Sequence, residues 1–425
     1  MRDNQTDIVR SVRSIIGSNN VTENPAVTID GLSPPLLARP ASAEEAGACL
    51  KACSEFDVSV IPAGRMSWLD CGNPPRRADV VLSLERMCRL VDYSPADLTA
   101  TVEAGLSLSE LNEITTKQRQ WLPLDPPGFN SASLGAIASC NSSGALRLGF
   151  GTPRDYVIGL RLAHIDGTQS KCGGRVVKNV AGYDLNKLYV GSYGTLAVIT
   201  QLTFKLRPVP ERSSTLMITA RYRGPLFLLA KKLLASDLQP ASVVLTRSLT
   251  PSGVTLPEDA LFIRFIDSEA AVEHQLRAAR ELADESYDVS NLGEAEARAV
   301  WSEVANFDQR AIRVRLSVPL SAVPAELEKA IILHLECVAC ADIGAGIIRV
   351  AFDADESVAA AQIERLRVGV NSSGGTLVIE KAPTGAKRQT DAWGDVGSTA
   401  MLMRSLKERF DPRSLLNPGI FVAGI

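Results

Sequence analysis

The sequence lacks several features that would assign it to a specialised class of protein. Its 425 residues carry a net charge of only −3, which gives no reason to expect nucleic acid or an anionic membrane as a partner. No apolar run approaches the roughly 20 residues of a membrane span. The opening segment, MRDNQTDIVRSVRSIIGSNN, is interrupted by Arg and Asp, unlike a secretory signal. We therefore expect a cytoplasmic protein without a transmembrane segment, which associates with the inner face of the membrane only through partners.

Cysteine and histidine are present but are not arranged as metal ligands. Only Cys337 and Cys340, of eight cysteines, form a CxxC, and no second pair completes a cluster. We expect small buried side chains in a reducing compartment, with a metal or redox site at the CxxC pair as the alternative. The three histidines, His164, His274 and His334, are far apart in the chain. The sequence therefore predicts no metal site.

What is present is the composition of a globular protein with several domains. Hydrophobic residues make up 45% of the chain and charged residues 22%, and the length favours about two or three domains. We predict a polar, loosely structured lead-in over residues 1–35 and a glycine-rich domain of mixed helices and strands over 36–210. A second α+β domain follows over 211–395, and a C-terminal segment over 396–425.

Periodicity and capping signals predict the main elements. Ser42 with Glu45, and Ser107 with Glu110, form capping boxes that begin two helices of the first domain. The second domain alternates helices with strands, which is typical of an antiparallel sheet with helices on one face. A last helix is predicted over 398–410, with an apolar stripe of Leu402, Leu406 and Phe410.

Two segments of the first domain are rich in glycine and other small residues. PAGRMSWLDCG, residues 62–72, follows a predicted strand and presents backbone N–H groups of the kind that hold a phosphate, although an ordinary turn fits equally well. Residues 123–159 have almost no large side chain between Asn130 and Ala145. Small residues let the backbone approach a ring system closely, so we expect an ordered loop packed on a flat ligand, with a mobile loop as the alternative.

A third segment, GGRVVKNVAGYDLNKLYVGSYGTLAVIT, covers residues 173–200. Gly191 and Gly194 bracket a turn before a predicted strand, which suggests another backbone-lined site. The alternative is a helix that ends at a glycine and leaves Asp184 exposed.

In order and spacing, these loops resemble the FAD-binding domain of the vanillyl-alcohol oxidase (PCMH-type) family. The matching stretches are 62–67, 125–159, 178–200 and the tail FDPRSLLNPG at 410–419. The resemblance covers about 36–210 and 396–425 and is faint over 211–395. Within the family, the pattern is most similar to the FAD-binding E subunits of bacterial glycolate oxidase (glycolate dehydrogenase).

The resemblance implies an α+β fold: an FAD-binding domain of two α/β subdomains, a second α+β domain with an antiparallel sheet, and a C-terminal helix that returns to the FAD domain. FAD would lie extended across the first domain, and this mode needs no Rossmann G-x-G-x-x-G, which the sequence lacks. The first loop would hold the pyrophosphate and the second would line the flavin. The full set implied to bind FAD is Pro62, Ala63, Gly64, Arg65, Met66, Ser67, Pro126, Ser133, Leu134, Gly135, Ala136, Ser139, Asn141, Ser143, Gly144, Gly151, Asp155, Ile158, Val198, Ile199 and Asn417.

Several positions depart from the family pattern. Met66 replaces the second loop glycine, where a positive φ would cost about 1 kcal/mol, although Arg65 beside it is able to pair with a phosphate oxygen. Ala136 replaces a flavin-loop glycine and Tyr193 an acidic residue. Cys140 in the second loop is either a small packing residue or a covalent tether.

The catalytic residue is left unknown. The family's catalytic members carry a His-rich strand motif, and the matching stretch here, CADIGAGIIRVAF at 340–352, contains no histidine. Tyr183 and Asp184 are the remaining candidates for a general base.

The resemblance implies an FAD-dependent oxidoreductase acting on the CH–OH group of 2-hydroxy acids. The preferred interpretation is the FAD-binding subunit of a glycolate oxidase complex that converts glycolate to glyoxylate and passes electrons to a catalytic flavoprotein subunit and an iron–sulfur subunit. One alternative is a self-sufficient dehydrogenase whose substrate carboxylate is held by arginines; Arg313 and Arg315 share a strand face that suits such a clamp or a solvated surface equally. Arg310 and Arg349 are further candidates. The other alternative is a non-catalytic flavin-domain scaffold, with Met66 as its sign.

Overall fold

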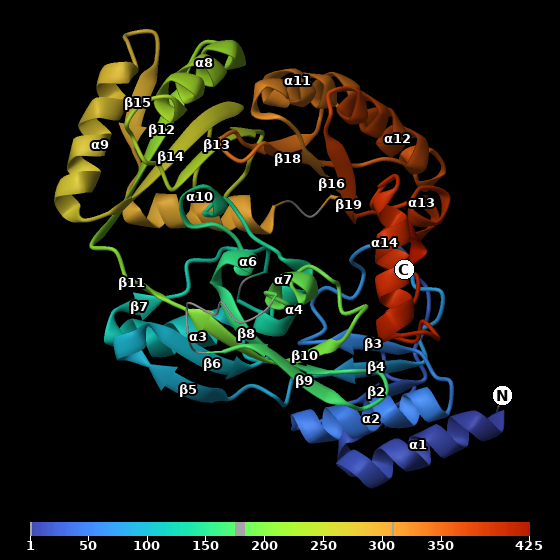
Figure 1. The fold of residues 1–425 in the computed structure, drawn as a ribbon. Coiled ribbons are helices and arrows are strands. Elements are labelled where there is room, and N and C mark those ends of the chain that lie inside the picture. Colours follow the sequence, from blue (N-terminus) through green and yellow to red (C-terminus); the bar gives the residue numbers. More distant parts are fainter. Residues whose placement is uncertain (1, 129, 175–182, 308–309) are drawn as a thin grey trace.

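The computed structural model describes residues 2–128, 130–174, 183–307 and 310–425. It contains sheets of four, five and eight strands and one two-stranded pair. The two smaller sheets lie side by side in the N-terminal half, and the eight-stranded sheet lies across them (Figure 1). None of the described helices combines the length and the apolar character that a membrane span needs.

The first sheet has the strand order β1-β2-β4-β3, in which β2, β4 and β3 are parallel and β1 is antiparallel to β2. Helix α2 begins as predicted, because the Ser42 side chain accepts a hydrogen bond from Glu45 N at 3.1 Å. The elements are α1 (Arg2–Ile16), β1 (Val21–Glu23), β2 (Leu36–Ala38), α2 (Ala43–Glu55), β3 (Val60–Ala63) and β4 (Val80–Ser83).

Helix α1 corrects the prediction of a loosely structured lead-in. Ile8, Val9, Val12 and Ile16 are buried, and their spacing places them on one helix face that packs against α2. Charged and polar residues between them obscure this period in the sequence, so the stretch reads as polar although one of its faces is apolar.

The second sheet is antiparallel throughout, with the order β5-β6-β10-β8-β9. Ser107 and Glu110 form the predicted capping box at the start of α3. The elements are β5 (Leu90–Ser94), β6 (Thr99–Glu103), α3 (Leu108–Thr115), β7 (Gln120–Trp121), α4 (Leu134–Cys140), α5 (Arg147–Phe150), α6 (Pro153–Tyr156), β8 (Val157–Ala163), β9 (Gln169–Gly173), α7 (Asn186–Tyr189), β10 (Val198–Lys205) and β11 (Arg207–Pro208), which pairs with β7.

The third sheet has the order β15-β12-β14-β13-β17-β18-β16-β19, and every pairing in it is antiparallel, as predicted. Its elements are β12 (Arg212–Thr219), α8 (Arg223–Leu234), β13 (Ser242–Arg247), β14 (Asp259–Asp267), α9 (Glu269–Leu282), β15 (Asp288–Asn291), α10 (Glu294–Asn306), β16 (Ile312–Ser317), α11 (Val323–Leu333), β17 (Val338–Asp342), β18 (Ile347–Phe352), α12 (Glu356–Ser372) and β19 (Thr376–Lys381).

The prediction that all helices cover one face of this sheet is wrong for α10. Helices α8, α9, α11 and α12 share one apolar core with the sheet. Helix α10 instead lies beneath the sheet, on the side of the N-terminal half (Figure 1), where Val300 and Trp301 pack with Phe262 and Val338 in a separate cluster. The two faces of this sheet therefore pack in two separate apolar cores, because successive side chains along a strand point to opposite faces.

The C-terminal segment returns to the first sheet. Helices α13 (Thr384–Gln389) and α14 (Thr399–Phe410) precede a tail in which Val60 N donates to Leu415 O at 2.8 Å and Asn417 N donates to Val60 O at 2.9 Å. The expected apolar stripe of α14 is wrong at Leu402, which is exposed. Short 3₁₀ helices complete the fold: η1 (Ser18–Asn20), η2 (Pro95–Asp97), η3 (Thr116–Gln118), η4 (Leu320–Ala322) and η5 (Val422–Gly424).

The boundaries predicted for the domains, at about residues 35, 210 and 395, stay predictions. The cysteines are all free thiols, and Cys337 and Cys340 are buried in clusters on the two faces of the third sheet.

Candidate functional site

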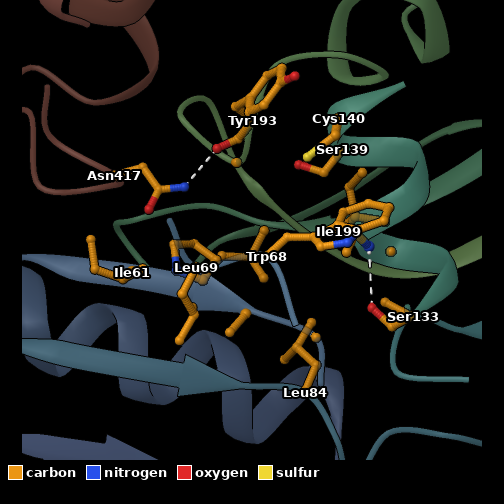
Figure 2. Close-up of a pocket in the computed structure, with 18 of the residues that line it drawn as sticks. Ile61, Trp68, Leu69, Leu84, Ser133, Ser139, Cys140, Tyr193, Ile199 and Asn417 are labelled. Atoms are coloured by element: carbon orange, nitrogen blue, oxygen red, sulfur yellow. Dashed lines mark hydrogen bonds between the residues drawn. The ribbon is translucent and has the colours of Figure 1, made fainter. Parts of the chain in front are cut away.

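A pocket of about 780 Å³, open solvent included, lies between the first two sheets and the C-terminal tail. The predicted loops meet there (Figure 2). Its walls are mostly backbone, small side chains and apolar side chains, as is typical of ligand sites. The lining residues are Ile61, Pro62, Ala63, Gly64, Arg65, Met66, Ser67, Trp68, Leu69, Cys71, Leu84, Ala104, Ser133, Gly135, Ala136, Ser139, Cys140, Tyr193, Gly194, Ala197, Val198, Ile199, Asn417 and Ile420.

The loop after β3 depends on close backbone contact at Gly64. A Cβ added at Gly64 would lie 1.8 Å from the Oγ of Ser133, so no side chain fits there while Ser133 caps α4 by accepting a hydrogen bond from Ala136 N at 3.2 Å. Met66 adopts a φ of +59°, the left-handed conformation that favours glycine. Its side chain packs against the small apolar cluster around Ile61.

Arg65 is already engaged within the protein. Its guanidinium donates to Glu110 Oε1 at 2.7 Å and to Gly105 O at 3.0 Å. The alternative role of pairing with a phosphate would therefore require Arg65 to share or exchange these partners.

The turn that contains Gly191, Tyr193 and Gly194 has positive φ angles of +88°, +54° and +65° at these residues. This conformation is why so short a segment needs two glycines. The Asn417 side-chain amide donates to Tyr193 O at 2.6 Å, as Figure 2 shows, while Asn417 Oδ1 is buried without a partner among the described residues. A pocket-lining acceptor left in this state suits a ligand that offers an N–H donor.

A buried lysine on α14 fixes this turn to the tail. Lys407 is 3% exposed, and its ammonium donates to Asp411 Oδ2 at 2.6 Å, to Thr195 O at 2.8 Å and to Leu416 O at 2.8 Å. A second buried lysine, Lys387, donates to Asp70 O at 2.8 Å and so holds the loop after β3. Neither lysine stands out in the sequence, because both occur in ordinary polar helical stretches.

A second, more polar cavity adjoins the first pocket, with which it shares Trp68, Cys71, Cys140 and Tyr193. It encloses about 1420 Å³, open solvent included, between the N-terminal half and strands β16, β18 and β19. Its charged lining residues are Arg147, Arg154, Arg313, Arg315, Arg349 and Glu380. The excess of arginine makes this cavity electropositive although the whole chain is weakly acidic.

Glu380 is surrounded by three of these arginines. Its carboxylate oxygens lie 3.2 Å from Arg313 Nε, 3.4 Å from Arg315 Nε and 3.3 Å from Arg349 Nε. Burial works against ionisation of Glu380, but the three cations outweigh it and hold the pKa of this carboxyl below its usual value. The Arg147 side chain, in contrast, has no hydrogen bond or ion pair with any described residue, and burial, with Arg315 and Arg349 nearby, lowers its pKa.

Some of the candidate arginines and bases of the sequence analysis lie outside the two cavities. Arg310 does not line the cavity and lies 3.4 Å from Asp353. Tyr183 is 96% exposed and Asp184 also lies outside both cavities. The expected alternative of a helix followed by a glycine describes this stretch, because α7 ends just before Gly191 and Asp184 is exposed.

The histidines lie away from the two cavities, and no group among the described residues could hold a metal ion. His164 stacks on Phe410 with ring centroids 6.0 Å apart, and His334 stacks on Phe352 at 3.7 Å. The prediction that His334 is a core or surface residue agrees with this packing.

Most of the residues predicted to bind the cofactor line the first pocket: Pro62, Ala63, Gly64, Arg65, Met66, Ser67, Ser133, Gly135, Ala136, Ser139, Val198, Ile199 and Asn417. Asn141 and Ser143 line the second cavity. Gly144 lines a third, smaller one. The first part of the third loop, residues 175–182, lies outside the described residues.

The remaining predicted residues lie outside these three cavities and have local contacts instead: Pro126 and Leu134 are buried, Gly151 has a positive φ, Asp155 accepts from Thr152 N at 2.8 Å, and Ile158 O accepts from Asn186. Their contact with a cofactor stays a prediction. Trp68, Tyr193 and Ile420 line the first pocket although the sequence analysis did not assign them to it; their positions within the matched loops and tail were the available signal.

Comparison with known proteins gives this geometry a context. Residues 34–173 match the family model described as an FAD binding domain. Solved structures with the same fold include alkyldihydroxyacetonephosphate synthase, at a TM-score of 0.77 and 16% identity over 97% of this chain and 85% of that one. They also include p-cresol methylhydroxylase with substrate bound, at a TM-score of 0.77 and 14% identity, over 99% of this chain and 97% of that one. The chain therefore contains a segment similar to an FAD binding domain and shares the overall fold of these solved structures. The α+β fold and the FAD-binding domain predicted from the sequence are thus confirmed.

Curated relatives fall into two groups by coverage. Glycolate oxidase subunit GlcD of Bacillus subtilis (strain 168) is 30% identical over 249 residues, 56% of this chain and 52% of that protein. Glycolate oxidase subunit GlcE of Escherichia coli (strain K12) is 34% identical over 45% of this chain and 51% of its own length. The match thus spans about half of these subunits. The mitochondrial D-lactate dehydrogenase [cytochrome] of Arabidopsis thaliana is 28% identical over 91% of this chain and 73% of that one.

Proposed function

We propose that this chain is an FAD-dependent oxidoreductase that oxidises a small 2-hydroxy acid, and that it acts as the FAD-carrying subunit of a glycolate oxidase complex. In that role glycolate becomes glyoxylate, and electrons leave through a catalytic flavoprotein subunit and an iron–sulfur subunit. The observation that carries the proposal is the arginine-rich cavity that adjoins the pocket of the FAD-binding domain and shares four lining residues with it.

The first pocket fits FAD in three respects. Its backbone comes so close at Gly64 that a Cβ would collide with Ser133, as expected for a loop that presents N–H groups to a pyrophosphate. Its walls beside α4 and β10 are small or apolar, which suits a ring system. Asn417 Oδ1 supplies a buried acceptor without a partner. Bound there, FAD would supply a two-electron acceptor, and the residues proposed to hold it are the predicted ones that line the pocket.

The second cavity fits a small organic anion. Three arginines share the single charge of Glu380, and the Arg147 side chain forms no ion pair with a described residue. The positive charge of this half-buried arginine is therefore available to a ligand, so the cavity favours one that brings a carboxylate. Its position beside Cys140 and Tyr193 of the first pocket would bring the substrate carbon next to the ring of the cofactor.

The subunit role is supported by the glycolate oxidase subunits among the relatives and by the lack of histidine in both cavities. A second candidate is a self-sufficient dehydrogenase, because the D-lactate dehydrogenase relative matches nearly the whole of this chain. The sister subunits, a cytoplasmic location and attachment to the membrane through partners remain part of this proposal.

The visible absorption spectrum of the purified chain tests the proposal. We expect a flavin spectrum, with FAD released on denaturation, that glycolate does not bleach anaerobically until the sister subunits are added. Bleaching of the isolated chain by glycolate or D-lactate would replace the subunit role with the self-sufficient dehydrogenase. A colourless chain that still binds its sister subunits would make it a scaffold and overturn the assigned activity.

A further inference from the structure

A third, smaller cavity, with room for about one water molecule, lies behind the arginine-lined one. It is enclosed by the loop after α4 and by β13, α10, β17 and β18, and it shares Ser143, Arg147 and Arg349 with the arginine-lined cavity. Among the described residues, Asp342 at the end of β17 is the one acidic residue that lines it. The two cavities therefore place this carboxyl behind the same arginines that we propose to hold the substrate.

The Asp342 carboxyl is buried and only partly satisfied. The residue is 7% exposed. Its Oδ1 accepts a hydrogen bond from Ala345 N at 3.3 Å. Its Oδ2 is buried without a hydrogen-bond partner among the described residues, and no described arginine or lysine forms an ion pair with it. A buried carboxyl oxygen in this state is costly unless it receives a proton or a ligand.

The charges around Asp342 leave it able to change protonation near neutral pH. Burial raises the pKa of its carboxyl to about 7, opposed by Arg147, the Ala345 N–H and Arg349, while Asp125 acts in the raising direction. These are the charged groups that face it from the N-terminal loops and from β18. A group of this pKa can take up a proton and release it again under ordinary conditions.

The other carboxyls of this region are occupied. Glu380 is ion-paired with three arginines. Asp125 accepts hydrogen bonds from Gly144 N at 2.9 Å and Leu146 N at 3.0 Å, so it fixes the loop after α4. Glu380 Oε2 also accepts no hydrogen bond, but it lies 3.2 Å from Arg313 Nε. Among the described residues that line the two charged cavities, Asp342 is thus the one carboxyl without an ion pair.

We propose that Asp342 accepts the hydroxyl proton of the 2-hydroxy acid while Arg147 and Arg349 hold the substrate carboxylate beside it. This inference rests on the proposed function. The O–H bond of the substrate breaks and its proton passes to Asp342 Oδ2. FAD held in the first pocket would supply the two-electron acceptor for the Cα–H hydrogen, so that the C–O bond becomes the carbonyl of a 2-oxo acid. Asp342 then returns its proton to solvent.

The experiment measures binding and turnover with the complete protein complex. Oxalate, an unreactive dianion over the whole pH range used, is titrated calorimetrically between pH 6 and pH 8. A negative Asp342 repels an anion and a neutral one does not, so oxalate should bind roughly tenfold tighter at pH 6, the effect of one pKa unit of coupling. In Asp342→Asn this pH dependence should vanish. A pH-independent affinity in the unaltered protein would overturn the proposal, whether or not the variant folds.

Turnover gives the second readout. Rates with the unaltered protein should rise with pH through about 7, as expected for a base that must be ionised. Asp342→Asn should lower turnover by about 10²–10⁴-fold, with FAD content and melting temperature retained, and Asp342→Glu should recover part of it. Asp288→Asn makes the same chemical change on the exposed edge strand of the same sheet and should alter neither readout.

The two proposals fail in different ways. If none of the 2-hydroxy acids reduces the flavin of the unaltered complex, the proposed function fails. If a 2-hydroxy acid does reduce it, but Asp342→Asn keeps the rate and the pH profile of the unaltered complex, the role of Asp342 is wrong and the function stands.

Discussion

The two adjoining cavities are built by different means. The first is made of closely packed backbone at Gly64 and left-handed backbone at Met66 and Gly194, held from behind by buried lysines. The second is made largely of long charged side chains, which project from strands β16, β18 and β19 and from two short helices. We infer that the first region recognises a large ligand by shape and backbone hydrogen bonds, and that the second recognises a small ligand by charge.

The largest effect is expected from Glu380→Gln, which tests whether charge alone defines the second cavity. The change leaves three half-buried arginines without their counter-ion, so the free energy of unfolding at pH 7 should fall by about 3 kcal/mol, as measured by denaturant unfolding. Oxalate should bind more tightly because the arginines are freed, and FAD content should stay the same. Glu281→Gln, on the exposed face of α9, is the control.

The pH dependence of this effect has a definite sign. The pKa of Glu380 is lowered in the folded protein, so its contribution is complete above the ordinary glutamate pKa of about 4.3 and is lost as the pH falls through the folded value. The stability difference between the two proteins should therefore shrink in acid. A stability difference that stays constant down to the pH of acid unfolding would contradict the view that the charge of Glu380 stabilises the arginines.

Gly64→Ala tests the first cavity. Its Cβ would lie 1.8 Å from Ser133 Oγ, and relief of such a contact typically requires about 1–3 kcal/mol. We expect FAD affinity, measured by fluorescence quenching on titration of the apoprotein, to fall by a corresponding factor, while oxalate affinity per FAD-loaded molecule changes little. Gly174→Ala, where an added Cβ meets no atom of the described residues within 4 Å, should leave FAD binding unchanged.

Met66 allows the smallest and finest test. Glycine should relieve the left-handed conformation by about 1 kcal/mol, whereas alanine keeps a Cβ and therefore keeps the strain. Both variants remove the thioether side chain. The difference in FAD affinity between Met66→Gly and Met66→Ala therefore measures the effect of the left-handed backbone conformation alone. If the two variants bind FAD equally, strain at this residue does not affect the cofactor.

The sequence predicted the backbone-built region better than the charge-built one. The glycines around Gly64 and Gly194 are required locally, so short motifs reveal them. The grouping of Arg313, Arg315 and Arg349 around Glu380 depends on the pairing of three strands, including a register shift between Arg313 and Val314, and no local pattern records such a shift. Lys407 was missed for the same reason, because its partners come together only when the tail returns to β3.

The most direct test of the whole account is whether oxalate perturbs the visible spectrum of FAD bound to the purified protein. If the arginine-lined cavity opens onto the flavin, oxalate should shift the flavin bands in a saturable way, and Glu380→Gln should lower the concentration needed. A flavin spectrum that oxalate leaves unchanged, although calorimetry shows that it binds, would contradict the proposed contact between the two cavities.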